Sequence, residues 1–164
     1  MAFWSNNTLE PLRKFRFKIQ FGNDVMWWAK SVTQPSPDIS VSEHQLINHK
    51  IKYPGIVTWN DIDITFVDIG DKGKDMYDLL GFFGYNPPSD KDGSPYTGKE
   101  GILKEQFQGD VFSIQKIDAN GKTIETWDLI NPFIKSIKYG DLDYSADDLL
   151  EVTITVAYDS ATLT

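Results

Sequence analysis

The sequence has no cysteine among its 164 residues. Disulfide bonds, thiolate metal sites and cysteine nucleophiles are therefore excluded. Histidine is nearly as scarce, since only His44 and His49 are present and no cysteine can complete a zinc site with them. The two lie five residues apart in an extended segment, so we expect them on opposite faces, as surface or interface residues.

Basic residues are outnumbered by acidic ones, and long apolar runs are lacking. The 16 Lys and Arg against 24 Asp and Glu give a net charge of −8, whereas binding to nucleic acid rests on positive charge. No apolar run approaches the roughly 20 residues of a membrane-spanning helix. The first residues show no basic stretch followed by an apolar one, so no signal peptide is expected. We therefore expect assembly in the cytoplasm, no membrane partner and no specific binding of DNA.

Apolar and aromatic side chains are plentiful, at 40% and 13% of the residues. A chain of this length buries roughly 70% of the surface that it exposes when unfolded, so we expect one domain over residues 1–164. Aromatic residues are enriched at interfaces. Trp27 and Trp28 are neighbours in an expected strand, which puts them on opposite faces and one of them at an interface.

Alternation of apolar and polar residues predicts most of the secondary structure. Residues 13–21 alternate Phe and Ile with charged or polar residues, as a half-buried strand does, and residues 25–32 are expected to return beside it. Two further candidate strands flank a polar stretch broken by Pro54-Gly55. Residues 39–67 therefore predict an extended hairpin with a long turn.

The second half of the chain shows one clear turn and one helical pattern. Asn120-Gly121 is a preferred tight-turn pair and lies between two alternating stretches, which predicts a hairpin. Residues 150–158 predict the last strand, and residues 71–83 carry the only helical spacing of apolar residues. Together these patterns predict a mainly β fold, an antiparallel β-sandwich or barrel of about seven to eight strands with one α-helix.

The stretch YGDLDYSADDLL, which begins at Tyr139, holds four aspartates ahead of the last strand. Four of its side chains fall at alternate ligand positions of an EF-hand loop, but Ala146 and Val152 stand where that loop requires Gly and Glu. Paired catalytic carboxylates would need burial or crowding, and a turn between strands predicts solvation instead. Nucleophile-elbow and phosphate-loop patterns are absent. We predict a polar turn here, and for the whole chain no enzymatic activity, metal or cofactor.

Residues 86–101 form a long polar stretch rich in Pro, Gly and Asp. Loops of this length within a compact domain are uncommon and are usually functional or disordered. We expect this loop to face outward and to contact a surrounding protein.

Three segments resemble a known family. They are the opening strand RKFRFKIQF, the stretch KYPGIVTWNDIDITFVD, and the C-terminal WDLINPFIKSIKYGDLDYSADDLLEVTITVAYD over Trp127–Asp159. In this order they resemble the tail-tube proteins of contractile-tailed bacteriophages, which are related to the tube proteins of type VI secretion and of extracellular contractile injection systems. The resemblance spans most of the chain.

The resemblance implies a structural virion protein that is not an enzyme. Such chains self-assemble into hexameric rings, the inner sheets join around each ring, and the rings stack into a hollow tail tube that conducts viral DNA into the host. The implied partners are further copies of the chain, the tail sheath protein, and baseplate and terminator proteins. The implied location is the tail of the virion, after assembly in the host cytoplasm.

The resemblance also implies a hairpin arm that reaches a neighbouring ring, matching roughly residues 44–58. Its residues here are His44, His49, Lys50, Lys52, Tyr53, Pro54 and Thr58. Polar strand faces are candidates for the lumen: Asp61, Asp63, Thr65, Glu151, Thr153 and Thr155. Further interface candidates are Trp27, Trp28, Asp141, Asp143 and Tyr144.

Three alternatives remain open at the level of the sequence. The chain could form the tube of a contractile injection system rather than of a phage. It could be a tail-terminator or baseplate-junction protein with the same fold. The aspartate-rich turn keeps open a calcium-dependent β-sandwich binding module.

Overall fold

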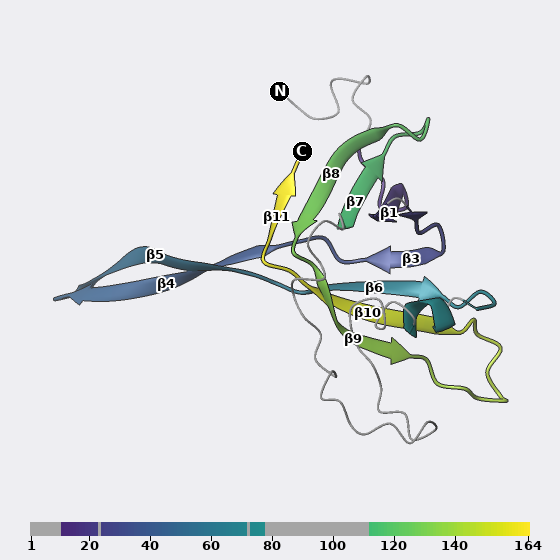
Figure 1. Ribbon diagram of the computed structural model, residues 1–164. Helices are drawn as coiled ribbons and strands as arrows, with labels where there is room; N and C mark the ends of the chain where they lie inside the picture. The colour runs from purple at the N-terminus through teal and green to yellow at the C-terminus, as the bar shows by residue number, and fades with distance from the viewer. Residues whose placement is uncertain (1–10, 23, 72, 78–111) are drawn as a thin grey trace, which may run out of the picture.

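The structure, a computed structural model, describes residues 11–22, 24–71, 73–77 and 112–164 (Figure 1). In these ranges it contains eleven strands: β1 Phe17–Phe21, β2 Asp24–Val25, β3 Ala29–Val32, β4 Pro37–Leu46, β5 His49–Trp59, β6 Ile62–Val67, β7 Phe112–Ile117, β8 Thr123–Ile130, β9 Phe133–Tyr139, β10 Glu151–Ala157 and β11 Ser160–Leu163. The described part of the chain contains no helix long and apolar enough to cross a membrane.

The strands form two sheets and a separate ribbon. One sheet has the order β11-β8-β7-β1-β2, the second has the order β3-β6-β10-β9, and β4 pairs only with β5. All pairs are antiparallel. Neither sheet closes on itself within the described ranges, so the predicted antiparallel sandwich is confirmed and its barrel alternative is not.

The core lies between the two sheets. Ile19 and Ile114 face inward from the first sheet, and Ile64 and Ile154 from the second, each with at most 2% of its surface exposed. In β6 and β10 every second residue is buried, as the alternation predicted. Because this one cluster draws on both sheets, burial of its apolar surface holds them together.

The helical prediction is confirmed in part. Residues 73–77 are helical, and the side chain of Met76 is buried in the core. Residues 78–83 of the predicted helix and the predicted outward-facing loop at 86–101 lie outside the described residues.

The single strand expected over residues 25–32 is wrong. Its place is taken by β2, which pairs with β1, and β3, which pairs with β6 of the other sheet. Trp27 and Trp28 form the turn where the chain crosses from one sheet to the other. Alternation cannot show such a crossing, because both halves keep an extended backbone.

The hairpin around Asn120-Gly121 is confirmed as β7 and β8. Asp118 organises its turn, because its Oδ1 accepts hydrogen bonds from the backbone N–H groups of Asn120 and Lys122, both at 2.8 Å. Gly121 adopts a left-handed φ of 80°, a conformation that glycine reaches without steric cost.

The long turn expected within residues 39–67 is also wrong. The stretch around Pro54 is strand β5, which pairs with β4 along its length, while β6 belongs to the core sheet. Proline is tolerated here because a two-stranded ribbon leaves one edge of each strand unpaired. The arm is therefore longer than residues 44–58, and it begins at Pro37.

Candidate assembly surfaces

The β4–β5 hairpin is an arm that extends away from the two sheets (Figure 1). Its strands are 10 and 11 residues long, about 33 Å at roughly 3.3 Å per residue. Trp59 at its base packs against the core, yet the arm carries several large apolar side chains that are at least half exposed: Ile39, Val41, Leu46, Ile47, Tyr53, Ile56 and Val57. A solvated ribbon gains nothing from these side chains, which indicates a surface for contact.

The register of the arm corrects the expectation for the histidines. His44 stands opposite Ile51, and Leu46 stands opposite His49. Residues opposite each other, and residues two apart on one strand, share a face, so both histidines lie on the same face. The prediction of opposite faces failed because the chain reverses at Ile47 and Asn48, between the two histidines.

The other face of the outer arm, which comprises residues 41–54, is charged. Glu43 forms ion pairs with Lys50 at 3.4 Å and with Lys52 at 3.7 Å. The outer arm therefore has one face with apolar and histidine side chains and one face with paired charges.

A bulge divides the outer arm from its base. The register shifts between Ile39 and Val41, and the backbone N–H of Ile56 donates to Ser40 Oγ at 2.8 Å. A Cβ on Gly55 would collide with Ser40 Oγ, so a larger residue would displace this hydroxyl from its hydrogen bond with Ile56. At the base, the side-chain amide of Asn60 donates to Asp38 Oδ2 at 2.8 Å. Among the other predicted arm residues, Pro54 stands opposite Val41, and Thr58 Oγ1 donates to Asp38 O at 3.5 Å.

The six predicted lumen residues come together on and beside the outer face of the β3-β6-β10-β9 sheet. Thr155 Oγ1 donates to Asp63 Oδ1 at 2.7 Å, and the hydroxyls of Thr65 and Thr153 lie 3.3 Å apart. The last two, Asp61 and Glu151, pair with lysines that sequence reasoning did not assign to this face.

These lysines change the charge of the face. Lys135 Nζ lies 2.6 Å from Asp61 Oδ2, and Lys30 pairs with Glu151. The hydrogen bond and the negative charge of Asp61 raise the pKa of Lys135 above its usual value. The face is therefore a mixture of hydroxyls and ion pairs rather than a uniformly acidic surface. Only strand pairing reveals this, because Lys30 and Lys135 lie far from their partners in the sequence.

The loop between β9 and β10 holds the aspartate-rich stretch. Asp143 Oδ1 accepts hydrogen bonds from the backbone N–H of Ser145 at 2.9 Å and from its hydroxyl at 2.8 Å, and these bonds lower the pKa of Asp143. The carboxylate is thus used within the turn. In the described residues no group of three or more His, Asp or Glu side chains could hold a metal ion.

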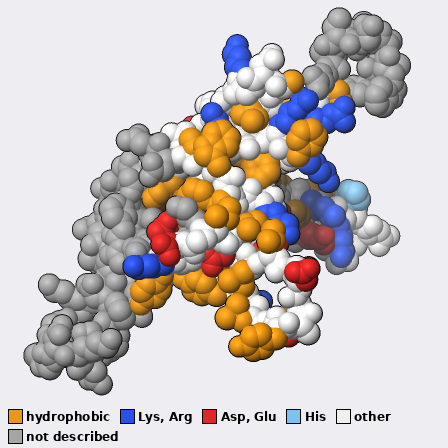
Figure 2. Space-filling model, turned by 90° about the vertical axis from the view of Figure 1, so that its right-hand side faces the viewer, with side chains coloured by type: hydrophobic (Ala, Val, Ile, Leu, Met, Phe, Trp, Pro, Cys, Tyr) orange, Lys and Arg blue, Asp and Glu red, His pale blue; other side chains and the backbone are white. Residues whose placement is uncertain are grey.

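The same loop directs apolar side chains into solvent. Leu142 is 86% exposed, Leu149 is 73% exposed, and Tyr144 is fully exposed. Figure 2 views the end of the molecule that carries this loop, and hydrophobic side chains appear there among acidic and basic ones. The loop therefore offers both apolar and acidic groups to a partner.

The adjacent tryptophans have different environments. Trp27 is 73% exposed, whereas Trp28 is partly buried against the core, with its ring 6.2 Å from that of Phe66. The expected division into an outward and an inward tryptophan is confirmed, although a turn rather than a strand produces it.

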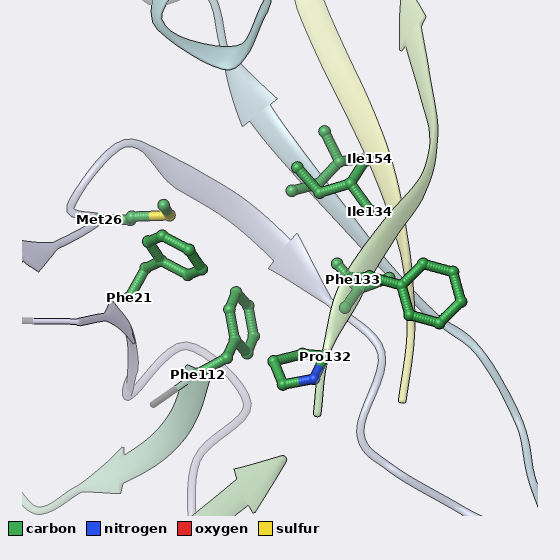
Figure 3. Close-up of a pocket in the computed structure, with 8 residues that line it drawn as sticks. Phe21, Met26, Phe112, Pro132, Phe133, Ile134 and Ile154 are labelled. Atoms are coloured by element: carbon green, nitrogen blue, oxygen red, sulfur yellow. The ribbon is translucent and has the colours of Figure 1, made fainter. Parts of the chain in front are cut away.

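One pocket opens between the two sheets (Figure 3). Figure 3 shows Phe21 and Phe112 facing Pro132 and Ile134 across it. All its lining residues are apolar: Phe21, Met26, Phe112, Pro132, Phe133, Ile134, Ile154 and Val156. It offers no group for acid–base or nucleophilic chemistry.

Comparisons with known proteins found similar structures but no similar sequences. No family model and no curated protein matches the chain. A structure of the anti-feeding prophage cap, a tube-terminating cap, is 15% identical with a TM-score of 0.72, covering 100% of this chain and 99% of that one. A sheath–tube complex of the extracellular contractile injection system PVC is 16% identical with a TM-score of 0.69, covering 100% and 98%.

A more distant structure is Hcp1 from Flavobacterium johnsoniae, at 10% identity and a TM-score of 0.52, covering 91% of this chain and 94% of that one. At such identities the likeness shows a shared fold. The resemblance stated from the sequence is therefore confirmed at the level of the fold.

Proposed function

We propose that this chain is a structural subunit of the inner tube of a contractile phage-like machine. One observation carries the proposal: the fold likeness to a tube-terminating cap and to a sheath–tube complex covers the whole chain. Copies of the chain form six-membered rings, and the rings stack into a hollow conduit.

Each candidate surface takes one role in this assembly. The arm, with its exposed apolar side chains, bridges to a copy in the next ring. The polar face of the β3-β6-β10-β9 sheet lines the conduit, where hydroxyls and paired charges give a wetted wall. Trp27 and the β9–β10 loop take part in contacts between copies. Among the described strands, those at the edges of the two sheets have one neighbour each, and this supports closure around a ring because unpaired edges favour pairing with another chain.

The role is structural, in one domain and with no cofactor. The proposed partners are further copies of the chain, the sheath protein, and baseplate and terminator proteins, and the proposed location is an extracellular tail-like particle assembled in the cytoplasm. The similar structures include a tube-terminating cap, a baseplate and a sheath–tube complex, which supports these partners.

Two finer questions are whether the machine is an injection system or a phage tail, and whether the chain extends the tube or ends it. The similar structures come from the anti-feeding prophage, PVC and Hcp proteins, which favours an injection system. Passage of viral DNA stays a prediction for a phage tail. The likeness to the tube-terminating cap supports a second candidate, a terminator that ends the tube instead of extending it.

Negative-stain electron microscopy of the purified protein over a concentration series tests the proposal. We expect rings with a central channel that stack into tubes as the concentration rises. Single rings that never stack would favour the terminator. A particle of one-chain size at every concentration would contradict the proposal.

A further inference from the structure

The outer arm and the β9–β10 loop lie at opposite ends of the molecule (Figure 1). Each exposes apolar side chains that its own chain leaves uncovered, Leu46 and Ile47 on the arm and Leu142 and Tyr144 on the loop. Because the arm points away from the sheets, it has no access to the loop of its own chain. Any contact between the two surfaces joins different molecules.

The charges of the two surfaces are complementary. Residues 43–53 of the arm contain Lys50 and Lys52 against one carboxylate, so this segment is basic within a chain of net charge −8. Residues 140–150 contain four aspartates and no basic residue. Opposite potentials steer two surfaces together and fix their orientation, while the apolar side chains supply the area to be buried.

The tip of the arm shows a backbone feature that agrees with a contact role. Ile47 is the first residue of the two-residue turn and adopts a left-handed φ of 51°. A β-branched residue is strained there, where hairpins favour glycine, and the side chain is 86% exposed. A glycine would form this turn with less strain but would present no side chain.

We propose that the outer arm of one copy docks on the β9–β10 loop of a second copy of this chain. The apolar face with Leu46 and Tyr53, together with Ile47 at the tip, meets Leu142 and Tyr144. Lys50 and Lys52, on the other face of the two-stranded ribbon, extend past its edge toward Asp147 and Asp148. The inference deepens the proposed function, on which it rests, by identifying the surface that receives the arm.

This contact has a defined symmetry. The two surfaces differ and lie at opposite ends, so the contact is head-to-tail and repeats from one copy to the next. Every copy then uses its arm once and its loop once, as continued stacking requires. At one end of a stack the arms would be left without loops, and at the other end the loops without arms.

The absence of cysteine allows a direct test by cross-linking. An Ile47→Cys protein and a size-tagged Tyr144→Cys protein are mixed, treated with a short bis-maleimide, and imaged in parallel by negative-stain electron microscopy. The control replaces Tyr144→Cys by Ala119→Cys, which lies in the exposed β7–β8 turn. We expect the Ile47→Cys and Tyr144→Cys proteins to give the mixed cross-linked dimer at about ten times the control yield. One well-placed charge pair alone strengthens binding by about that factor.

Exchanging the charges of the arm and the loop tests the specificity of the contact. Lys50→Glu with Lys52→Glu in the arm copy should lower the mixed product about tenfold, and Asp147→Lys with Asp148→Lys in the loop copy should restore it. All four side chains are exposed, so the variants keep the core intact.

The outcomes separate the two proposals. Rings or tubes without cross-linking above the control overturn the docking and leave the tube function standing. Cross-linked product in preparations that contain no rings supports the docking and contradicts the tube function. If neither assemblies nor cross-links form, both proposals are overturned.

Discussion

At the scale of single residues, the two faces of β10 have different tasks. Ile154 is buried between the sheets, whereas its neighbour Thr155 faces outward and donates to Asp63. Ile154→Ala should lower the free energy of unfolding by about 2–5 kcal/mol, because it removes buried apolar atoms and leaves a cavity. Thr155→Ala is the matched control and should cost about 1 kcal/mol. Urea unfolding measures both, and equal losses would contradict the assigned faces.

Asp143 allows a prediction about pH. Hydrogen bonds from Ser145 lower its pKa in the folded state below the unfolded value, so the ionised carboxylate stabilises the fold above the unfolded pKa of about 4. This contribution is lost as the pH falls through the lower folded pKa.

Ser145→Ala removes the hydroxyl donor and keeps the backbone donor. The pKa of Asp143 should then rise part of the way toward its usual value, as measured by NMR titration of the carboxyl carbon. Ser145→Thr keeps a hydroxyl and should retain most of the shift. A pKa that does not respond to loss of the hydroxyl would show that this bond does not form in solution.

At the scale of elements, the β7–β8 hairpin depends on one side chain in its turn. Asp118→Ala removes the acceptor of two backbone hydrogen bonds, and we expect a loss of about 1–2 kcal/mol in the free energy of unfolding. Asp118→Asn keeps a side-chain oxygen and should cost less. A loss as large for Asn as for Ala would indicate that charge rather than the acceptor matters.

The arm is an element whose stability and function can be separated. Ser42 and Tyr53 stand opposite each other, so residues 43–52 can be replaced by Asn-Gly to give a shorter hairpin. The arm adds no buried residue to the core, so the sandwich should keep its free energy of unfolding within about 1 kcal/mol, while stacking into tubes should be lost. Thermal unfolding and electron microscopy measure the two effects.

Ala119→Ser, in the exposed β7–β8 turn, is the control for this shortening and should change neither stability nor stacking. Tubes that form from the short-armed protein would contradict the bridging role of the arm. Loss of folding would instead show that the arm supports the sandwich.

At the scale of the whole molecule, the two sheets share one buried cluster. Trp127 on β8 packs against this cluster from one sheet, and Trp28 packs beside β6 of the other. A shared core predicts a single cooperative transition. Tryptophan fluorescence and far-ultraviolet circular dichroism should therefore give the same urea midpoint for the short-armed protein. Two separated midpoints would show that the sheets unfold independently.

The sequence by itself determined the faces of the strands and one turn. Period-two patterns depend only on the alternation of side chains along an extended chain, so the buried residues of β6 and β10 and the polar face of Asp63, Thr65, Thr153 and Thr155 could be predicted. Asn120-Gly121 revealed its hairpin because the backbone preference of glycine is local. The family resemblance predicted the fold, although identities of 10–16% left no similarity that sequence comparison detects.

Only the tertiary structure decided which strands are partners. Pairing is a contact between residues distant in sequence, and an extended segment looks alike in either sheet or in a ribbon. For this reason the strand expected over 25–32 divides between two sheets, the expected long turn became β5, and both histidines share one face of the arm. The same long-range contacts bring Lys30 to Glu151 and Lys135 to Asp61, so the charge of the polar face follows from the fold rather than from composition.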